Sequence, residues 1–519
     1  MDKKTLALLI LIIFLGITLR VYNIGKESFW IDESATAMSL RLYNAREILY
    51  NTLVVGNILP NDYPAVTDPP VYYITLHYWA KLFSISEASL RMYSVLIWLF
   101  SAVFMFLTAN MLLGKRTAII SSFLFSISIP SIAFSQEARG YMLYLFFGLT
   151  SMYYLFKALN ENKNFNWVMY TVFVVLGIYT HHLFSILLFF QLLYATFDFI
   201  IIKKYSVRHI LGNLFRRKEM IRMFYSYLAI GLFLIPAALR MLRENNAWWA
   251  KPTITSAVKL FMNFATWIYP TAEGRDKIND GLFLQLGNFD MLLLFSVAVT
   301  AIVSYSLILY LTYVKLRKCR AKDFFFRENK IIFLFGWLAF PLAFSLTFSV
   351  VTPISIFSTF HYFFYGLPPF IMLLAMGMLE FKHKYFKFLL IVFILVNLVP
   401  LYAYYHNVDK QQWRELAQYM KNNLGKNEPV LISIYSGETS FRYYFGDYNQ
   451  VYGVKGLDEE AKSVLKDSDR VWLVLTLWKY YDPKGTLQEY IDANYELIKE
   501  EKKFFDIEVY HYKKKVKIN

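Results

Sequence analysis

The polar residues that could carry chemistry in this 519-residue chain lie beside long apolar stretches. Asp32 and Glu33 follow Trp30, shortly after the first apolar stretch. Adjacent carboxylates on a helix point about 100° apart, so one could accept a proton from a substrate while the other orients a partner. The alternative is that Asp32 caps a helix lying on a membrane, and the spacing does not decide between the two readings.

Charged residues also stand at two other points. Asp68 comes just before two prolines and Tyr72, where a helix with proline in its first turn can begin, and a helix cap is again the alternative. Arg139 stands between Glu137 and Tyr141. A guanidinium at headgroup level suits bidentate binding of a phosphate, while interface anchoring or a pair with Glu137 explains it equally well.

Histidines occupy two breaks between apolar stretches. His181 and His182 stand together, and His361 precedes Tyr362. Two adjacent histidines without a carboxylate partner are weak evidence for zinc, and a polar turn is the simpler interpretation. No metal site is therefore predicted.

The composition indicates a membrane protein. Hydrophobic residues make up 57% of the chain, aromatic residues 19% and charged residues only 18%, which excludes a soluble multidomain enzyme and a disordered chain. Eleven stretches are apolar enough to span a bilayer. They cover residues 5–22, 94–113, 118–134, 141–159, 167–179, 183–202, 224–242, 291–314, 331–351, 362–379 and 388–405. The prediction is a polytopic α-helical membrane protein, with amphipathic helices in the long loop after the first span.

Charge predicts the orientation. Residues 407–519 hold 18 basic and 18 acidic residues, so the whole net charge of +16 lies in residues 1–406. Its basic clusters fall in alternate loops, which places the N-terminus in the cytoplasm and residues 407–519 outside the cell membrane. Nucleic acid is excluded as a partner, because this charge faces the inner leaflet. The first span lacks a cleavage site before Arg20, so we expect an uncleaved anchor.

Residues 407–519 predict a separate small α/β domain, outside the membrane domain of residues 1–406. Residues 413–423 have the pattern of an amphipathic helix, and residues 430–435 and 471–477 are short apolar runs typical of strands. The single cysteine, Cys319, excludes an intramolecular disulfide.

The motifs, taken in order, resemble those of GT-C glycosyltransferases of the protein O-mannosyltransferase and aminoarabinose-transferase group. The matching runs are Trp30-Ile31-Asp32-Glu33-Ser34-Ala35, Asp68-Pro69-Pro70-Val71-Tyr72-Tyr73, Leu90-Arg91-Met92-Tyr93-Ser94, Ser135-Gln136-Glu137-Ala138-Arg139-Gly140-Tyr141 and Tyr179-Thr180-His181. The similarity is good over about the first 185 residues. Departures are Asp68, where relatives often have His, Lys or Glu, and His361, where many have Arg.

The resemblance implies an inverting transfer of one sugar from a polyprenyl (dolichyl or undecaprenyl) phosphate to a protein, lipid or glycan at the outer membrane face. Asp32 would be the general base, with Glu33 supporting it. Arg139, Tyr141 and His361 would hold the donor phosphate. Asp68, Tyr72, His181 and His182 would line the substrate site. The resemblance implies no required metal or other cofactor.

Two other classes of protein remain as alternatives. A transporter of lipid-linked sugar or polysaccharide predicts ionisable residues at mid-membrane depth, where the predicted spans have almost none. A receptor or structural membrane protein predicts that Asp32→Asn leaves function intact. An oligosaccharyltransferase, within the first class, would normally have a carboxylate set for a metal and a larger outer domain.

Overall fold

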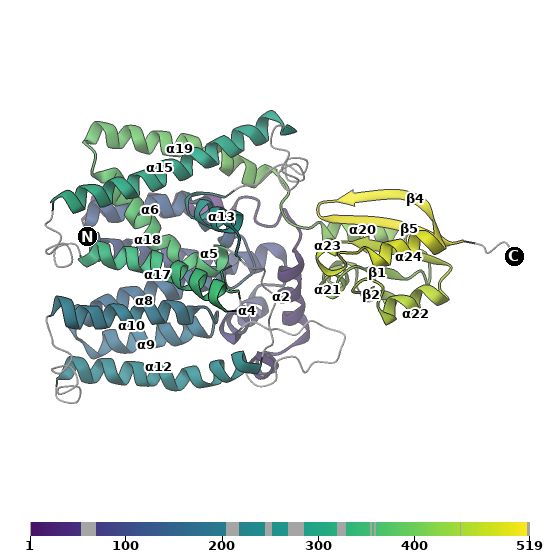
Figure 1. Cartoon of the computed structure of the whole chain (residues 1–519), viewed down its shortest axis with the longest axis horizontal. Coiled ribbons are helices and arrows are strands. Elements are labelled where there is room, and N and C mark those ends of the chain that lie inside the picture. Colours follow the sequence, from purple (N-terminus) through teal and green to yellow (C-terminus); the bar gives the residue numbers. More distant parts are fainter. Residues whose placement is uncertain are drawn as a thin grey trace.

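The computed structural model has two parts, a helical bundle and a C-terminal sheet with its own helices (Figure 1). It describes residues 2–52, 69–203, 217–243, 252–267, 285–318, 329–352, 355–357, 360–446 and 448–515. We call the bundle end nearest the sheet the sheet-side end.

Nine helices in the described ranges are long and apolar enough to cross a membrane. They are α1 (Lys3–Val21), α5 (Glu87–Leu113), α8 (Tyr141–Glu161), α10 (Phe184–Phe197) continued by η2 (Asp198–Ile202), α12 (Lys218–Arg243), α15 (Asn288–Lys318), α17 (Asn329–Val351), η4 (Phe360–Gly366) continued by α18 (Leu367–Leu379), and α19 (His383–His406). A bent pair, α6 (Lys115–Ile127) and α7 (Ile129–Ser135), forms a tenth.

The eleven stretches predicted from the sequence correspond to these nine helices, the bent pair and α9 (Asn164–Ile178), which has only 15 residues. Although it is short, α9 reaches from one end of the bundle to the other. Tyr179 at its C-terminal end accepts a hydrogen bond of 3.0 Å from the Val71 amide near the sheet-side end, and Asn162 before its start accepts one from Arg222 near the start of α12.

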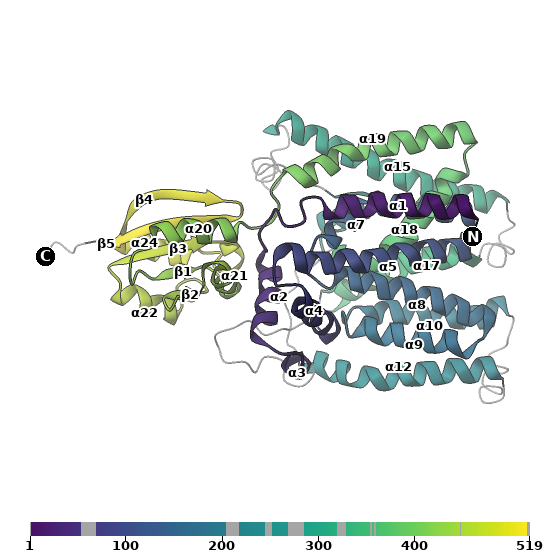
Figure 2. The ribbon, with the colours of Figure 1, turned by 180° about the vertical axis from the view of Figure 1, so that it is seen from behind.

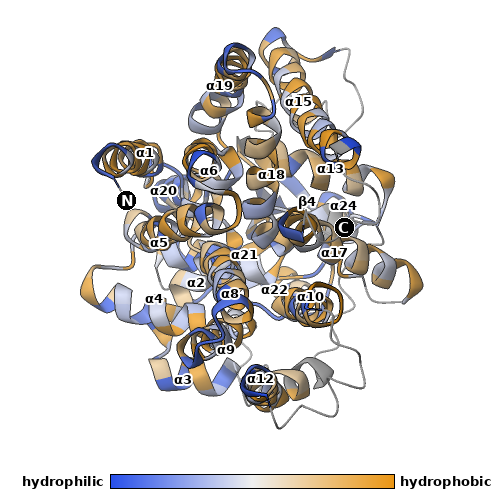
Figure 3. Cartoon of the chain, turned by 90° about the vertical axis from the view of Figure 1, so that its left-hand side faces the viewer, coloured by the Kyte–Doolittle hydropathy of each residue, from blue (hydrophilic) through white to orange (hydrophobic). Residues whose placement is uncertain are grey.

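Lipid-facing and buried helices differ in their side chains. Phe14 of α1 and Phe388 of α19 are 69% and 64% exposed, as expected of apolar groups that face hydrocarbon. Leu145 and Leu149 of α8 are fully buried. Viewed along the bundle in Figure 3, hydrophobic residues predominate on the long helices. Such helices can cross a bilayer because their backbone N–H and C=O groups form hydrogen bonds within the helix.

Three short helices follow α1 in the chain, before α5, and lie at the sheet-side end. They are α2 (Ile31–Leu42), α3 (Ala45–Tyr50) and α4 (Pro70–Leu82), and Figure 2 shows α2 running across the ends of the bundle helices. These are the helices predicted in the long loop after the first span, and α3 starts separately from α2 because Asn44 forms a capping box with Glu47. A helix does begin at Pro70, as predicted. Asp68 lies outside the described residues.

The break between α6 and α7 has a definite cause. The two helices are bent by 57°, and Pro130 in the first turn of α7 has no N–H to donate to the Ser126 carbonyl. Arg20 replaces that donor, with its Nη1 2.8 Å from the Ser126 oxygen and its Nη2 2.8 Å from Ser131 Oγ. The guanidinium also lies 3.8 Å from the Trp98 ring centroid. Arg20 thus fixes the direction in which α7 leaves the bend.

The region after α19 contains a five-stranded sheet in the order β2-β1-β3-β5-β4. Its elements are α20 (Trp413–Asn423), β1 (Val430–Ile432), α21 (Tyr435–Phe445), β2 (Val451–Gly453), α22 (Glu459–Asp467), β3 (Arg470–Leu475), α23 (Trp478–Tyr481), α24 (Thr486–Asn494), β4 (Tyr495–Phe504) and β5 (Ile507–Lys514). β1 pairs in parallel with β2 and β3, and β5 pairs antiparallel with β3 and β4. The predicted helix at 413–423 is confirmed. A strand lies in each predicted run, but β1 covers only Val430–Ile432 of residues 430–435, because α21 begins at Tyr435.

Candidate active site

Asp32 and Glu33 lie in the first turn of α2 and face different surroundings. The helix begins at Ile31, and its N-cap residue is Trp30, which makes no side-chain capping bond. Asp32 is therefore not the N-cap residue of this helix, although it lies in its first turn. Both carboxylates still gain from the partial positive charge at the helix N-terminus.

Glu33 is completely buried in a polar network. Its Oε1 accepts from Arg91 Nε at 2.9 Å and from the Ala138 amide at 2.8 Å. Its Oε2 accepts from Arg91 Nη2 at 2.7 Å and from Lys410 Nζ at 3.0 Å. Burial alone would raise the pKa of Glu33, but the charges and hydrogen bonds of Arg91 and Lys410 lower it to about 2. Glu33 is therefore an ionised anchor for its neighbours.

Asp32 points to a more open space. Its side chain is 41% exposed, and its Oδ2 lies 3.9 Å from Arg139 Nη2. Arg139 is largely buried, and its Nη1 donates to the Tyr73 hydroxyl at 3.0 Å and to Thr36 Oγ1 at 3.4 Å. An accessible carboxylate thus stands beside a guanidinium that two hydroxyl groups hold in place.

An aromatic cluster continues from Arg139. The guanidinium lies 6.0 Å from the Tyr141 ring centroid, and Tyr141 contacts His361 with centroids 4.6 Å apart. His361 lies 4.3 Å from the Tyr362 ring centroid, which lies 5.1 Å from that of His181. Residues expected from the sequence to bind the donor phosphate or the substrate are therefore neighbours, although they come from α8, η4 and the turn before α10. His182 follows in that turn, where its carbonyl accepts a bond from Ser185.

Tyr72 forms another side of the site, at the start of α4. A Cβ on Gly140 would stand 3.3 Å from Tyr72 Cγ, so a larger residue would have to push the loop and the ring apart by a few tenths of an ångström. Burial raises the pKa of Tyr72, which keeps its hydroxyl protonated. That hydroxyl is buried and has no hydrogen-bond partner among the described residues. A buried, unpaired donor beside a charged site is suited to a substrate oxygen.

The 136–140 loop, which carries Arg139, is anchored by contacts that the sequence did not predict. Gln136 Nε2 donates to the carbonyls of Arg20 at 2.7 Å and Tyr22 at 2.9 Å, and the Tyr404 hydroxyl donates to its Oε1 at 2.6 Å. Ser94 Oγ donates to the Glu137 carbonyl at 2.7 Å. The loop is therefore bound to α1, α5 and α19.

Arg91 and Lys410 are the main charged residues that sequence reasoning did not place in the site. Arg91 and Ser94 are three residues apart on α5, so they share a face of the helix; one binds Glu33 and the other the loop carbonyl. This spacing was a usable signal. Lys410, by contrast, is 377 residues from Glu33 and had no local signal. Within the described ranges, no group of three or more His, Cys, Asp or Glu side chains is placed to hold a metal ion.

Glu137 is a third carboxyl group of the site. Burial raises its pKa to about 7; Lys410 and Arg139 act against this rise, and Glu33 and Asp32 add to it. The folded protein therefore keeps this proton to about pH 7, whereas an ordinary glutamate loses it near pH 4.5.

For Glu137→Gln we expect a flatter dependence of stability on pH. In the wild type, stability falls as the pH rises from about 4.5 to about 7, because the unfolded chain ionises Glu137 before the folded one does. Above pH 7 the variant should be more stable than the wild type by about 1–2 kcal/mol. Each pKa unit corresponds to about 1.4 kcal/mol, and the full shift is discounted because solvent reaches part of the Glu137 side chain. Thermal unfolding in detergent at pH 5–8 measures this, and parallel curves for both proteins would contradict it.

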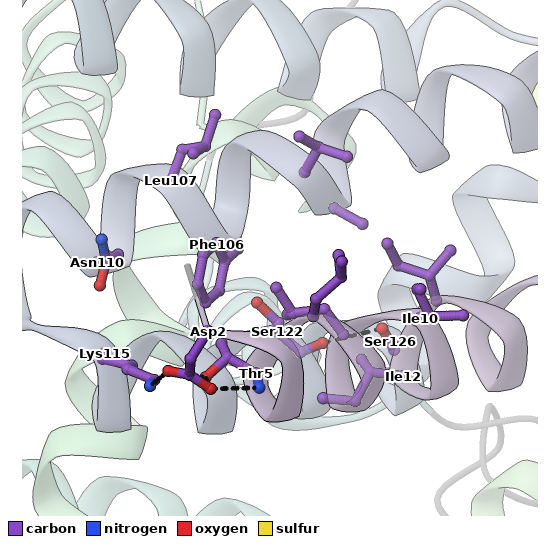
Figure 4. A pocket seen from close by; sticks show the side chains of 15 residues that line it. Asp2, Thr5, Ile10, Ile12, Phe106, Leu107, Asn110, Lys115, Ser122 and Ser126 are labelled. Carbon is purple, nitrogen blue, oxygen red and sulfur yellow. Dashed lines mark hydrogen bonds and ion pairs between the residues drawn. The ribbon is translucent and has the colours of Figure 1, made fainter.

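A separate hollow of about 500 Å³ lies between α1, α5 and α6. Figure 4 shows apolar side chains along it and Asp2 paired with Lys115 at one end. Lys115 starts α6, at the bundle end opposite the sheet, so this hollow is separate from the cluster around Asp32.

Comparison with known proteins gives one family match and several matching structures. Residues 67–216 match the family described as dolichyl-phosphate-mannose-protein mannosyltransferase. An uncharacterized protein of Aquifex aeolicus (strain VF5) is 29% identical over 170 residues, which are 32% of this chain. The match spans 32% of that relative's own length.

Solved structures match nearly the whole chain at low identity. ArnT from Cupriavidus metallidurans in the apo state has a TM-score of 0.58 at 9% identity, covering 97% of both chains. ArnT from the same organism bound to undecaprenyl phosphate has a TM-score of 0.52 at 10% identity, also covering 97% of both. The Archaeoglobus fulgidus oligosaccharyltransferase AglB, in complex with an inhibitory peptide and a dolichol-phosphate, has a TM-score of 0.53 at 12% identity, covering 95% of this chain and 73% of its own.

Proposed function

We propose that this chain, which has the fold of the GT-C glycosyltransferases, is an inverting glycosyltransferase. It moves one monosaccharide from a polyprenyl phosphate to a protein, lipid or glycan acceptor at the outer face of the cell membrane. The observation that carries this proposal is the accessible Asp32 carboxylate 3.9 Å from the held Arg139 guanidinium at the sheet-side end. The family match over residues 67–216 and the lipid phosphates named for ArnT and AglB support it.

The roles follow from the environments. Asp32 accepts the proton of the acceptor hydroxyl as its oxygen attacks the anomeric carbon, and the bond from that carbon to the phosphate oxygen breaks. Arg139 stabilises the negative charge that develops on the leaving phosphate. Tyr141 and His361 flank that position. Glu33 supports Asp32 by fixing the first turn of α2 rather than by taking the proton.

The substrate side of the site is assigned to Tyr72, His181, His182 and Asp68. We assign the Tyr72 hydroxyl as a donor to a sugar oxygen, and its burial with no hydrogen-bond partner in the described residues supports this. His181 adjoins Tyr362 in the aromatic cluster, and aromatic rings suit the apolar faces of a sugar. Asp68 enters this assignment from the sequence motif alone.

A transporter is the second candidate, and the position of the charges argues against it. In the described helices that cross the bundle, every Asp, Glu, Lys and Arg lies within five residues of a helix end. A transport pathway would place such groups near mid-depth. Charges concentrated at the ends favour a reaction at the membrane surface.

The same charges support the orientation we propose. Lys115, Lys203, Lys218 and Lys315 lie at the bundle end opposite the sheet, as expected for a cytoplasmic face. The N-terminus is then cytoplasmic and the site extracytoplasmic. We also assign residues 1–406 to the membrane domain and 407–519 to the extracytoplasmic α/β domain; α19 ends at His406, next to this boundary.

The test is sugar transfer by the purified protein from a panel of radiolabelled polyprenyl-phosphate monosaccharides to crude membrane acceptors. We expect transfer from one donor, and Arg139→Met should lose it because the leaving phosphate loses its counter-charge. Lys462→Met is the matched control, since Lys462 is half exposed and pairs with Glu459 on α22. Movement of labelled lipid across vesicles without sugar release would instead favour the transporter.

A further inference from the structure

We propose that the C-terminal region is part of the catalytic site, because it holds the segment that carries Asp32, and that Lys410 and Gln411 are the positioning residues. This inference rests on the proposed function of Asp32. The C-terminal region would then take part in the transfer reaction by positioning Asp32.

The first set of contacts lies on the N-terminal side of Asp32. The Gln411 carbonyl accepts from Ser28 Oγ at 2.6 Å, and its Oε1 accepts from the Ile31 amide at 3.2 Å. The Tyr444 hydroxyl accepts from the Phe29 amide at 2.6 Å. The backbone that leads into α2 is therefore bound to α21 and to residues 407–412, which connect α19 to α20.

The Ile31 side chain adds an apolar contact. It is buried and packs in the same cluster as Trp413, Ile434 and Phe441 of the C-terminal region. The residue directly before Asp32 is therefore a member of the C-terminal region's core. Burial of this isoleucine removes apolar surface from water, which favours one placement of the helix start.

The second set of contacts lies on the C-terminal side of Asp32. Lys410 Nζ lies 3.0 Å from Glu33 Oε2 and 3.2 Å from the Gln136 carbonyl oxygen. One side chain thus joins the residue after Asp32 to the loop that carries Arg139. Together, Lys410 and Gln411 hold both neighbours of Asp32 and set its position relative to Arg139.

The sheet supplies the fixed end of this connection. Gln411 Nε2 donates to Thr476 Oγ1 at 2.9 Å, and Ser433 Oγ donates to the Thr476 carbonyl at 2.8 Å. Ser433 and Thr476 follow the carboxyl ends of the parallel strands β1 and β3. In open α/β sheets ligands commonly bind at that edge. Here Gln411 connects that edge to the residues before Asp32.

Further contacts hold the C-terminal region against the helical bundle. Arg414 Nη1 lies 3.2 Å from Glu87 Oε1 at the start of α5, and the Tyr444 hydroxyl donates to the same carboxylate at 2.8 Å. Arg41 of α2 lies 3.9 Å from the Tyr443 ring centroid. The C-terminal region is therefore bound to α2 and α5 at several points.

The experiment compares Lys410→Met, Gln411→Ala and the control Lys462→Met. Because Lys410 and Gln411 position Asp32 without contacting the donor, kcat should fall about 10- to 100-fold while the KM for the donor stays within about twofold of the wild type. Lys410→Arg should restore most of kcat, since it keeps the charge beside Glu33. A wild-type kcat in both Lys410→Met and Gln411→Ala would overturn the inference.

Hydrogen exchange provides a readout that does not depend on catalysis. The amides of residues 28–34 should exchange faster in Gln411→Ala and Lys410→Met than in the wild type, while those of β3 stay protected. Unchanged exchange would overturn the inference. If exchange rises but the wild-type protein transfers no sugar from any donor, the proposed function fails and the holding contacts stand. If β3 loses its protection in one variant, that variant is globally unfolded, and the exchange of residues 28–34 in the other variant decides the inference.

Discussion

Asp32→Asn is expected to lower kcat by about 10²- to 10⁴-fold, the usual contribution of a general base. Asparagine has the shape of aspartate but cannot accept the proton of the acceptor hydroxyl. Donor affinity should stay the same or rise, because Arg139 loses a carboxylate at 3.9 Å that competes with the phosphate. With 41% of the side chain exposed, the free energy of unfolding should change by less than about 0.5 kcal/mol.

Single-turnover transfer with saturating radiolabelled donor measures this effect, with donor binding followed separately. Asp32→Glu is the matched control, because it keeps a base but displaces it, and it should lose less activity than Asp32→Asn. Full activity of Asp32→Asn would move the base to another residue, and Glu137 would be the first candidate, since its pKa of about 7 suits proton transfer near neutral pH.

Glu33→Gln should act on folding rather than on the proton transfer. The wild-type carboxylate is fully buried and accepts hydrogen bonds from Arg91, Lys410 and the Ala138 amide. Glutamine leaves the buried Arg91 and the partly buried Lys410 without their counter-charge. Breaking a buried pair in this way costs about 3–5 kcal/mol. Thermal unfolding in detergent at pH 7 should show a large loss of stability for this variant.

The pH dependence checks the same role of Glu33. Its pKa is about 2 in the folded protein against an ordinary 4.5, so its stabilisation is fully present above pH 4.5 and is lost as the pH falls towards 2. The difference in stability between wild type and Glu33→Gln should therefore shrink over this range. Lys462→Met should behave as the wild type throughout, and a constant difference across the range would contradict the ionised state of Glu33.

Local sequence patterns predicted most of the fold. The helix at Trp413–Asn423 and the start of α4 at Pro70 follow from amphipathic periodicity and from proline's tolerance of the first helical turn. Hydropathy also located the α6–α7 span, but it could not indicate the 57° bend, because the replacement of a proline's missing hydrogen bond by Arg20 is a tertiary contact.

The sequence predicted most of the residues of the candidate site, but only some of the contacts between them. Arg139, Tyr141 and His361 were expected to hold the donor phosphate and His181 to line the substrate site, and these residues are neighbours in the structure. The different tasks of Asp32 and Glu33 could not be read from two adjacent carboxylates, because they depend on Arg91 and Lys410. A residue such as Lys410, whose partner lies 377 positions away, becomes visible only once the chain is folded.

Arg20 has a consequence for how the protein is made. Helix α1 is synthesised before the acceptors of its arginine, because Ser126 and Ser131 follow Arg20 by 106 and 111 residues. Until then the guanidinium must stay at the water boundary, where a long side chain can keep its charge hydrated. We therefore expect helix α1 to reach its final depth only after α6 and α7 have been synthesised. The contact that sets the direction of α7 thus also makes the final position of α1 depend on the synthesis of α6 and α7.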